Sequence, residues 1–190
     1  TVAGLQTEQA LGKVRDVLAK SVGEGGTLVG FEDELGAGTF LSPQHMETVW
    51  RAGIQGAYSA GMDRIIANPL IGALFPFVVR NAIHDDRVRD DHLALETMGI
   101  EGTNIYLVSD PVFQKWKAPA DFGCRCGDTY ISVAQAAARG LKYAQEWLRT
   151  GVQPDPQQAY VMMPGFEPSP GWRREPILLA TLAAVNGYDL

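Results

Sequence analysis

The chain has 190 residues, of which 46% are hydrophobic and 20% charged, so its composition supports a folded core and excludes general disorder. Its net charge of -6 argues against broad electrostatic coating of nucleic acid, although the nearly neutral part after residue 114 leaves a local phosphate-contacting patch possible. The sequence contains no run of about 20 apolar residues, so we expect no membrane span.

Helical patterns dominate the first third of the chain. Residues 7–21 carry apolar side chains at helical spacing, and glycines follow them. Residues 27–35 predict a short acidic helix. Ser42 and Pro43 are typical of an N-cap and a first helical residue, so a longer helix should begin there and end at residue 67, before an Asn-Pro pair.

Three residues of this longer helix are candidate packing or interface positions. Trp50 and Tyr58 recur at the apolar positions of the helix. Arg51 lies among apolar residues and is expected to form an ion pair that fixes the packing. We expect these side chains to hold the helix against the rest of the chain or against a partner.

The middle of the chain changes character. Residues 75–83 are rich in β-branched and aromatic side chains and predict a strand. Residues 85–95 predict a charged turn or short helix, and residues 98–127 a loop-rich stretch. A second strand is expected at 128–132 and a helix at 133–148, despite a glycine within it.

The last part of the chain is rich in proline and should be irregular, either lying over the domain or reaching a neighbour. Its apolar end, residues 177–185, predicts a terminal helix or an anchor. The fold class is therefore α+β, with three regions. These are a helical N-terminal region (1–68) packed on a small β-containing core (69–150), and an extended Pro-rich C-terminal arm (151–190).

The candidate chemistry lies in two short segments. One is the charged run at 84–92, and the other contains Cys124 and Cys126, whose close spacing disfavours a disulfide and indicates a reducing setting. His92 with both cysteines would supply three zinc ligands, and Asp85 could be a fourth. The alternatives are a solvated charged turn and a core in which the thiols pack as small apolar groups.

A metal-dependent hydrolase is the rival class. The run at 84–92 has four aspartates and two histidines that could hold a divalent cation and activate water. However, the chain has no phosphate-cradling Gly loop, no nucleophile elbow and no dinucleotide fingerprint. We therefore do not expect an enzyme from the motifs alone.

The order of motifs resembles the phage Mu F-like family of head-morphogenesis, or minor capsid, proteins. The resemblance covers roughly residues 27–150, with a weaker echo at 164–172. The motifs are an aromatic helix at 47–61, an extended segment at 75–79, an Asp-x-Arg-Val-Arg-x-x-His turn at 85–92, Asp-Pro-Val-Phe at 110–113 and Cys-Arg-Cys at 124–126. The segment between residues 97 and 110 departs from the family pattern.

The resemblance implies a site and a role. Some relatives look as if they carry a further cysteine ligand where this chain has Arg89, so an ion pair of Arg89 or Arg87 with Asp85 in the core could replace the metal cross-link. The implied role is that of a structural virion protein in the phage head, assembled in the host cytoplasm and present in several copies. Its implied partners are the portal, major capsid or scaffold proteins, and packaged DNA is a further possible contact. The alternative is a metal-dependent nuclease or other hydrolase acting on DNA during packaging or ejection.

Overall fold

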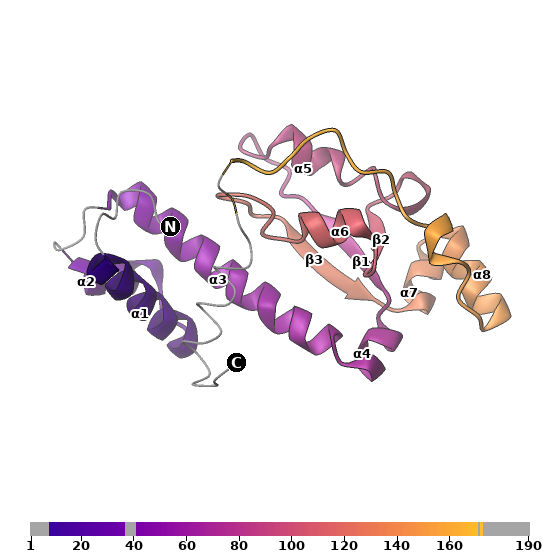
Figure 1. Cartoon of the computed structure of the whole chain (residues 1–190), viewed down its shortest axis with the longest axis horizontal. Coiled ribbons are helices and arrows are strands. Elements are labelled where there is room, and N and C mark those ends of the chain that lie inside the picture. The colour runs from indigo at the N-terminus through magenta and orange to yellow at the C-terminus, as the bar shows by residue number, and fades with distance from the viewer. Residues whose placement is uncertain (1–7, 37–40, 171, 173–190) are drawn as a thin grey trace. The chain divides into compact units, whose positions relative to one another are not determined.

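The computed structural model describes residues 8–36, 41–170 and 172 (Figure 1). These residues form two compact units. The first contains the chain up to Gly61 together with residues 121–123 and Trp172, and the second contains Met62–Ala120 and Cys124–Pro170. Among the helices of the described residues, none is long and apolar enough to cross a membrane.

The first unit is helical. It contains α1 (Glu8–Glu24), α2 (Leu28–Leu35) and the part of α3 (Pro43–Ile66) that ends at Gly61. These elements enclose an apolar core whose buried members are Val14, Val17, Phe31, Leu35 and Leu41. The three helices predicted from the sequence are thus confirmed.

Side-chain hydroxyl groups cap the starts of two of these helices, and Ser42 does so as predicted. The hydroxyl oxygen of Thr27 accepts a hydrogen bond from the Gly30 N–H, and that of Ser42 accepts one from the His45 N–H. Each hydroxyl therefore satisfies a backbone donor that the helix itself leaves unpaired.

The second unit is built on a three-stranded antiparallel sheet. Its strands are β1 (Phe77–Asn81), β2 (Ile105–Leu107) and β3 (Gly127–Ile131), in the order β2-β1-β3 (Figure 1). The central strand β1 pairs Val78 with Tyr106 on one side and with Tyr130 on the other. With helices around this sheet, the predicted α+β class is confirmed.

Each face of the sheet has its own apolar core, because alternate residues of a strand point to opposite faces. One core joins Phe77 and Val79 to the short helices α7 (Val133–Ala138) and α8 (Lys142–Thr150). The other joins Val78 to α6 (Pro111–Trp116) and to the segment that carries both cysteines. Cys124 and Cys126 therefore belong to the second of these cores.

The structure differs from the sequence predictions in several details. The stretch 98–127, predicted to be loop-rich, contains β2, α6 and the 3-10 helix η2 (Ile100–Gly102). The single helix predicted at 133–148 is two helices, and Gly140 lies between them with a φ of 91° that favours glycine. The Asn-Pro pair that ends α3 also begins a further helix, α4 (Pro69–Leu74), with Asn68 as its cap.

The described part of the Pro-rich segment packs on the second unit. After the 3-10 helix η3 (Pro156–Gln158), the Val161 N–H donates to Asp110, and the ring of Phe166 meets that of Trp116 edge-on with centroids 5.1 Å apart. Residues 151–170 are thus irregular, as expected, and lie over their own domain. The helix or anchor predicted at 177–185 falls outside the described residues.

Candidate functional site

The two cysteines lie on one side of the segment that leads into β3. Alternate residues of an extended segment share a side, so Cys124, Cys126 and Asp128 face one way and Arg125 takes the other, more exposed side. The pairing of β3 with β1 places Asp128 opposite Arg80. Neither cysteine forms a disulfide, and both thiols are buried and enter the core beside Arg80.

His92 reaches the same place from α5 (Asp90–Ala94), a single short turn that begins within the charged run. Its ring is 3% exposed and lies edge-on to Trp116. The His92 Nδ1 atom is 3.4 Å from the Cys126 Sγ atom, and one ligand atom from each of His92, Cys124 and Cys126 lies within 4.8 Å of the others. We call these three residues the thiol–histidine cluster.

A buried cation borders the cluster. Arg80 is 1% exposed, and its Nη1 group donates to the main-chain oxygen of Trp116 and, over 3.2 Å, to Asp128. Among the described residues, its Nε and Nη2 groups have no hydrogen-bond partner, and neither has Nε2 of His92. A buried charge with unpaired donors is costly, so this position favours an anion nearby.

The two thiols share a proton unequally. The pKa of Cys124 is lowered, chiefly by a hydrogen bond from Cys126 and also by His92 and the charge of Arg80. The pKa of Cys126 is raised, chiefly because it holds the proton of that bond. The surroundings therefore favour thiolate character at Cys124, which is the form of cysteine that binds metals.

Asp85 is held by a different partner from those predicted. Both of its carboxylate oxygens accept hydrogen bonds from the guanidinium of Arg125, one of them over 2.6 Å, and the Arg87 N–H adds a third. The hydrogen bond from Arg125 is the main cause that lowers the pKa of Asp85 to about 2. Asp85 is thus turned toward Arg125 and does not belong to the thiol–histidine cluster.

The other predicted positions are spread over the chain. Arg87 and Arg89 are exposed, so the ion pair predicted for the core is instead a partly exposed pair of Asp85 with Arg125. Within the first unit, the indole N–H of Trp50 donates to Ser21 over 3.2 Å. Arg51 pairs with Glu47 on the surface of α3, and Tyr58 is 67% exposed.

The aspartates of the charged run do not gather into a metal-binding group. Within the described residues, the thiol–histidine cluster is the one set of three or more His, Cys, Asp or Glu side chains with converging ligand atoms. His84 pairs with Glu96 over 2.8 Å at the surface. The run therefore contributes one histidine to the buried cluster and one aspartate to the Arg125 pair.

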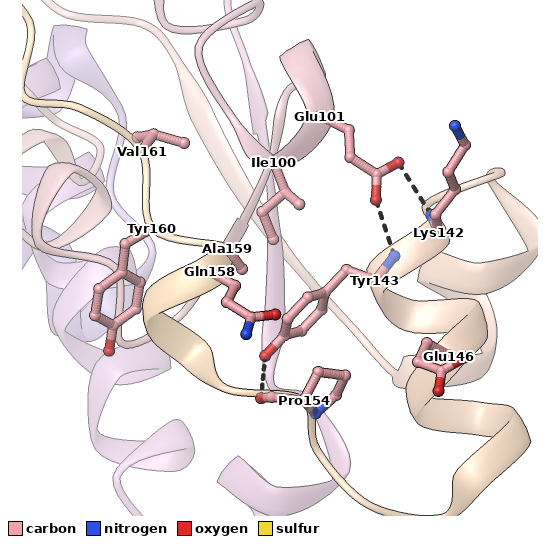
Figure 2. Close-up of a pocket in the computed structure, with 10 residues that line it drawn as sticks. All are labelled: Ile100, Glu101, Lys142, Tyr143, Glu146, Pro154, Gln158, Ala159, Tyr160 and Val161. Atoms are coloured by element: carbon pink, nitrogen blue, oxygen red, sulfur yellow. Dashed lines mark hydrogen bonds between the residues drawn. The ribbon is translucent and has the colours of Figure 1, made fainter.

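A hollow of about 390 Å³ lies elsewhere on the second unit, between α8 and the segment after it (Figure 2). Two of its polar side chains, those of Glu101 and Tyr143, are engaged in the fold. The carboxylate of Glu101 accepts the N–H groups of Lys142 and Tyr143 at the start of α8, and the Tyr143 hydroxyl donates to the Pro154 oxygen over 2.6 Å (Figure 2). These contacts hold the start of α8 and the segment after it in place.

Sequence reasoning missed Arg80 and its partner Asp128. A signal was present, because Arg80 follows three apolar residues in the strongest strand pattern of the chain. An arginine inside such a strand is buried with an acidic partner or lies at an edge. The strand register needed to find that partner was not predictable from the sequence.

Comparison with known proteins gives one informative match. No protein-family model and no solved structure matches the chain. The chain is 32% identical over 106 residues to the Mu-like prophage FluMu F protein of Haemophilus influenzae. The match covers 53% of this chain and 22% of that protein, so the chain spans about a fifth of the length of the relative it matches. The similarity supports a bacteriophage-related protein with a distant relationship to the phage Mu F-like family.

Proposed function

We propose that the chain is a structural protein of a tailed-bacteriophage head, acting in head assembly or at the portal and neck. The observation that carries this proposal is the similarity to the F protein of a Mu-like prophage over half of the chain. The order of motifs between residues 47 and 126 agrees with it, because it resembles the head-morphogenesis proteins.

The surface of the second unit suits a protein whose work is contact. None of the six residues of α4 is buried, and the side chains of Leu70 and Leu74 are 79% and 63% exposed. Ile65, just before α4, is also exposed. Apolar side chains gathered in this way are typical of surfaces that other proteins cover. The proposed partners are portal, major capsid or scaffold subunits.

The geometry favours this role over a hydrolase acting on DNA. A hydrolase of the kind expected from the charged run would need several of its carboxylates around one cation. In the described residues Asp85 is instead bound to Arg125, and the only converging ligand set is buried. A buried site of this kind stabilises a fold more readily than it admits a DNA strand.

The proposal is tested by locating the chain in intact particles. Phage encoding the chain are purified, and the heads are treated with a cross-linker and analysed by mass spectrometry. We expect the chain in DNA-filled heads, in several copies, with cross-links to a head or portal subunit. A chain that is abundant in the lysate but absent from purified particles would contradict the proposal.

The contact surface is tested separately with the double variant Leu70→Ser and Leu74→Ser. Because both side chains are exposed, the melting temperature should stay within a few degrees of the wild type. Incorporation into heads should fall, because the apolar area that a partner would cover is lost. The control is Met162→Ser, which removes an apolar side chain that is even more exposed (87%) from another segment of the same unit. Equal incorporation of the double variant and the control would argue against a contact at α4.

A further inference from the structure

The thiol–histidine cluster has the composition of a zinc site. Two thiols and one imidazole are the ligand types that zinc prefers, and all three residues are buried. A disulfide between Cys124 and Cys126 is the competing chemistry, but neither residue is in a disulfide, and a bridge across one intervening residue is strained. The ligand set therefore points to a metal more than to a redox pair.

The distances fit a tetrahedral ion. With Zn–S and Zn–N bonds of about 2.3 and 2.05 Å, neighbouring sulfur and nitrogen ligands of a tetrahedral site lie about 3.6 Å apart. The His92 Nδ1 atom and the Cys126 Sγ atom are 3.4 Å apart, close to this edge length. Since the ligand atoms of all three residues lie within 4.8 Å of one another, small side-chain rotations suffice to direct them at one centre.

The surroundings supply what a thiolate site needs. Arg80 is fully buried, and its Nε and Nη2 groups have no hydrogen-bond partner among the described residues. Its charge acts on both thiols. Donors of this kind, next to metal-bound sulfur, hold the ligands in place and stabilise their negative charge. Asp128 already neutralises Arg80, so the core remains close to neutral when the two thiolates balance a divalent ion.

We propose that His92, Cys124 and Cys126 bind one zinc ion through Nδ1 and the two sulfur atoms, with the loss of both thiol protons. The fourth position is filled by water, because Asp85 is bound by Arg125 and no further His, Cys or carboxylate of the described residues joins the group. The ion links α5 to the start of β3 across 32 to 34 residues of chain and thereby closes this side of the second unit.

The ligand set can be read without any variant. The full chain, purified in a reducing buffer and without a histidine tag, is loaded with zinc, desalted and analysed by elemental mass spectrometry and X-ray absorption. We expect about one zinc per chain, with two sulfur ligands near 2.3 Å and two nitrogen or oxygen ligands near 2.0–2.1 Å. A folded, reduced chain that retains no zinc, or an ion with fewer than two sulfur ligands, overturns the proposal.

Variants then assign the ligands. Cys124→Ser should weaken zinc binding by more than about 100-fold, beyond the effect expected when only an outer hydrogen-bond partner is lost. His92→Ala should do the same. The matched control is His84→Ala, which removes a surface histidine from the same charged run and should leave zinc binding unchanged. Equal losses in the His84 and His92 variants would show that the metal lies elsewhere, and circular dichroism identifies any variant that fails to fold.

Discussion

Two contacts join the same pair of segments, residues 84–92 and 124–126, and they differ in almost every physical respect. On the buried side of the segment that leads into β3, Cys124 and Cys126 meet His92 in the core. We call this the inner contact. On the opposite side of that segment, Arg125 pairs with Asp85 in partial contact with solvent. We call this the outer contact. Neighbouring residues of an extended segment thus place their side chains on opposite sides, one buried and the other partly exposed. Burial, more than the number of hydrogen bonds, therefore sets how much each contact contributes to the stability of the fold.

The largest effect is expected beneath the inner contact. Asp128→Ala removes the acidic partner of Arg80 and also an acceptor for the Ala118 N–H, so it leaves a buried guanidinium uncompensated. We expect a loss of about 3–5 kcal/mol in the free energy of unfolding, measured by urea denaturation. Replacing both partners by apolar residues, Arg80→Met with Asp128→Leu, should restore part of this loss. A loss below about 1 kcal/mol in the single variant would show that Arg80 is compensated by another group.

Removal of zinc should have the second-largest effect on stability. A ligand that binds the folded chain alone stabilises it by about 2.7 kcal/mol at a free concentration of 100 times its dissociation constant. On the zinc proposal, a chelator should therefore lower the melting temperature of the wild type in a zinc-dependent manner. The Cys124→Ser variant, already without the ion, serves as the control and should not respond. An identical response of both proteins would indicate that the chelator acts elsewhere.

A smaller effect is expected where the Pro-rich segment covers the inner side. Phe166→Ala removes the ring that packs edge-on against Trp116, the residue whose carbonyl oxygen accepts from Arg80. An aromatic pair of this kind contributes about 0.5–1.5 kcal/mol beyond its buried area, so the loss should be about 1–2 kcal/mol. Hydrogen exchange should also become faster in residues 160–167. An unchanged exchange rate would mean that this segment does not depend on the Trp116 contact.

The smallest effect should follow from loss of the outer contact. The pKa of Asp85 is lower in the folded chain than its usual value of 3.8, so ionised Asp85 stabilises the fold at neutral pH. This contribution should be lost as the pH falls from 3.8 towards about 2. The stability difference between the wild type and Asp85→Asn, measured by denaturation at several pH values, should therefore be constant near neutrality and vanish in acid. A difference that persists at pH 2 would argue against the Arg125 pair as its source.

The sequence predicted the longer elements well, because their signals are local. Ser42 caps the helix that it was expected to cap, and β1 lies where β-branched residues gather. It failed for short elements. The strand β2 has three residues, too few to show a period, whereas α6 could have been found from Asp110 and Pro111, an N-cap followed by proline.

The candidate site divides in the same way. That His92 and the two cysteines meet was expected from ligand chemistry and from the family resemblance, and the structure places them together. The partner of Asp85 was not predictable, because Arg125 lies 40 residues away and five arginines are nearer in the sequence. Which guanidinium reaches the carboxylate depends on the side of the segment before β3 on which each residue lies. No local sequence rule predicts that side.

The way in which α8 begins has a consequence for how the second unit folds. This helix has no capping side chain of its own, and its first N–H groups are satisfied by Glu101, about 40 residues earlier in the chain. A nine-residue helix is too short to persist alone in water. Helix α8 should therefore form only after η2, which carries Glu101, has reached its final place. Its formation would then be a late step in the folding of the second unit and not the step that starts it.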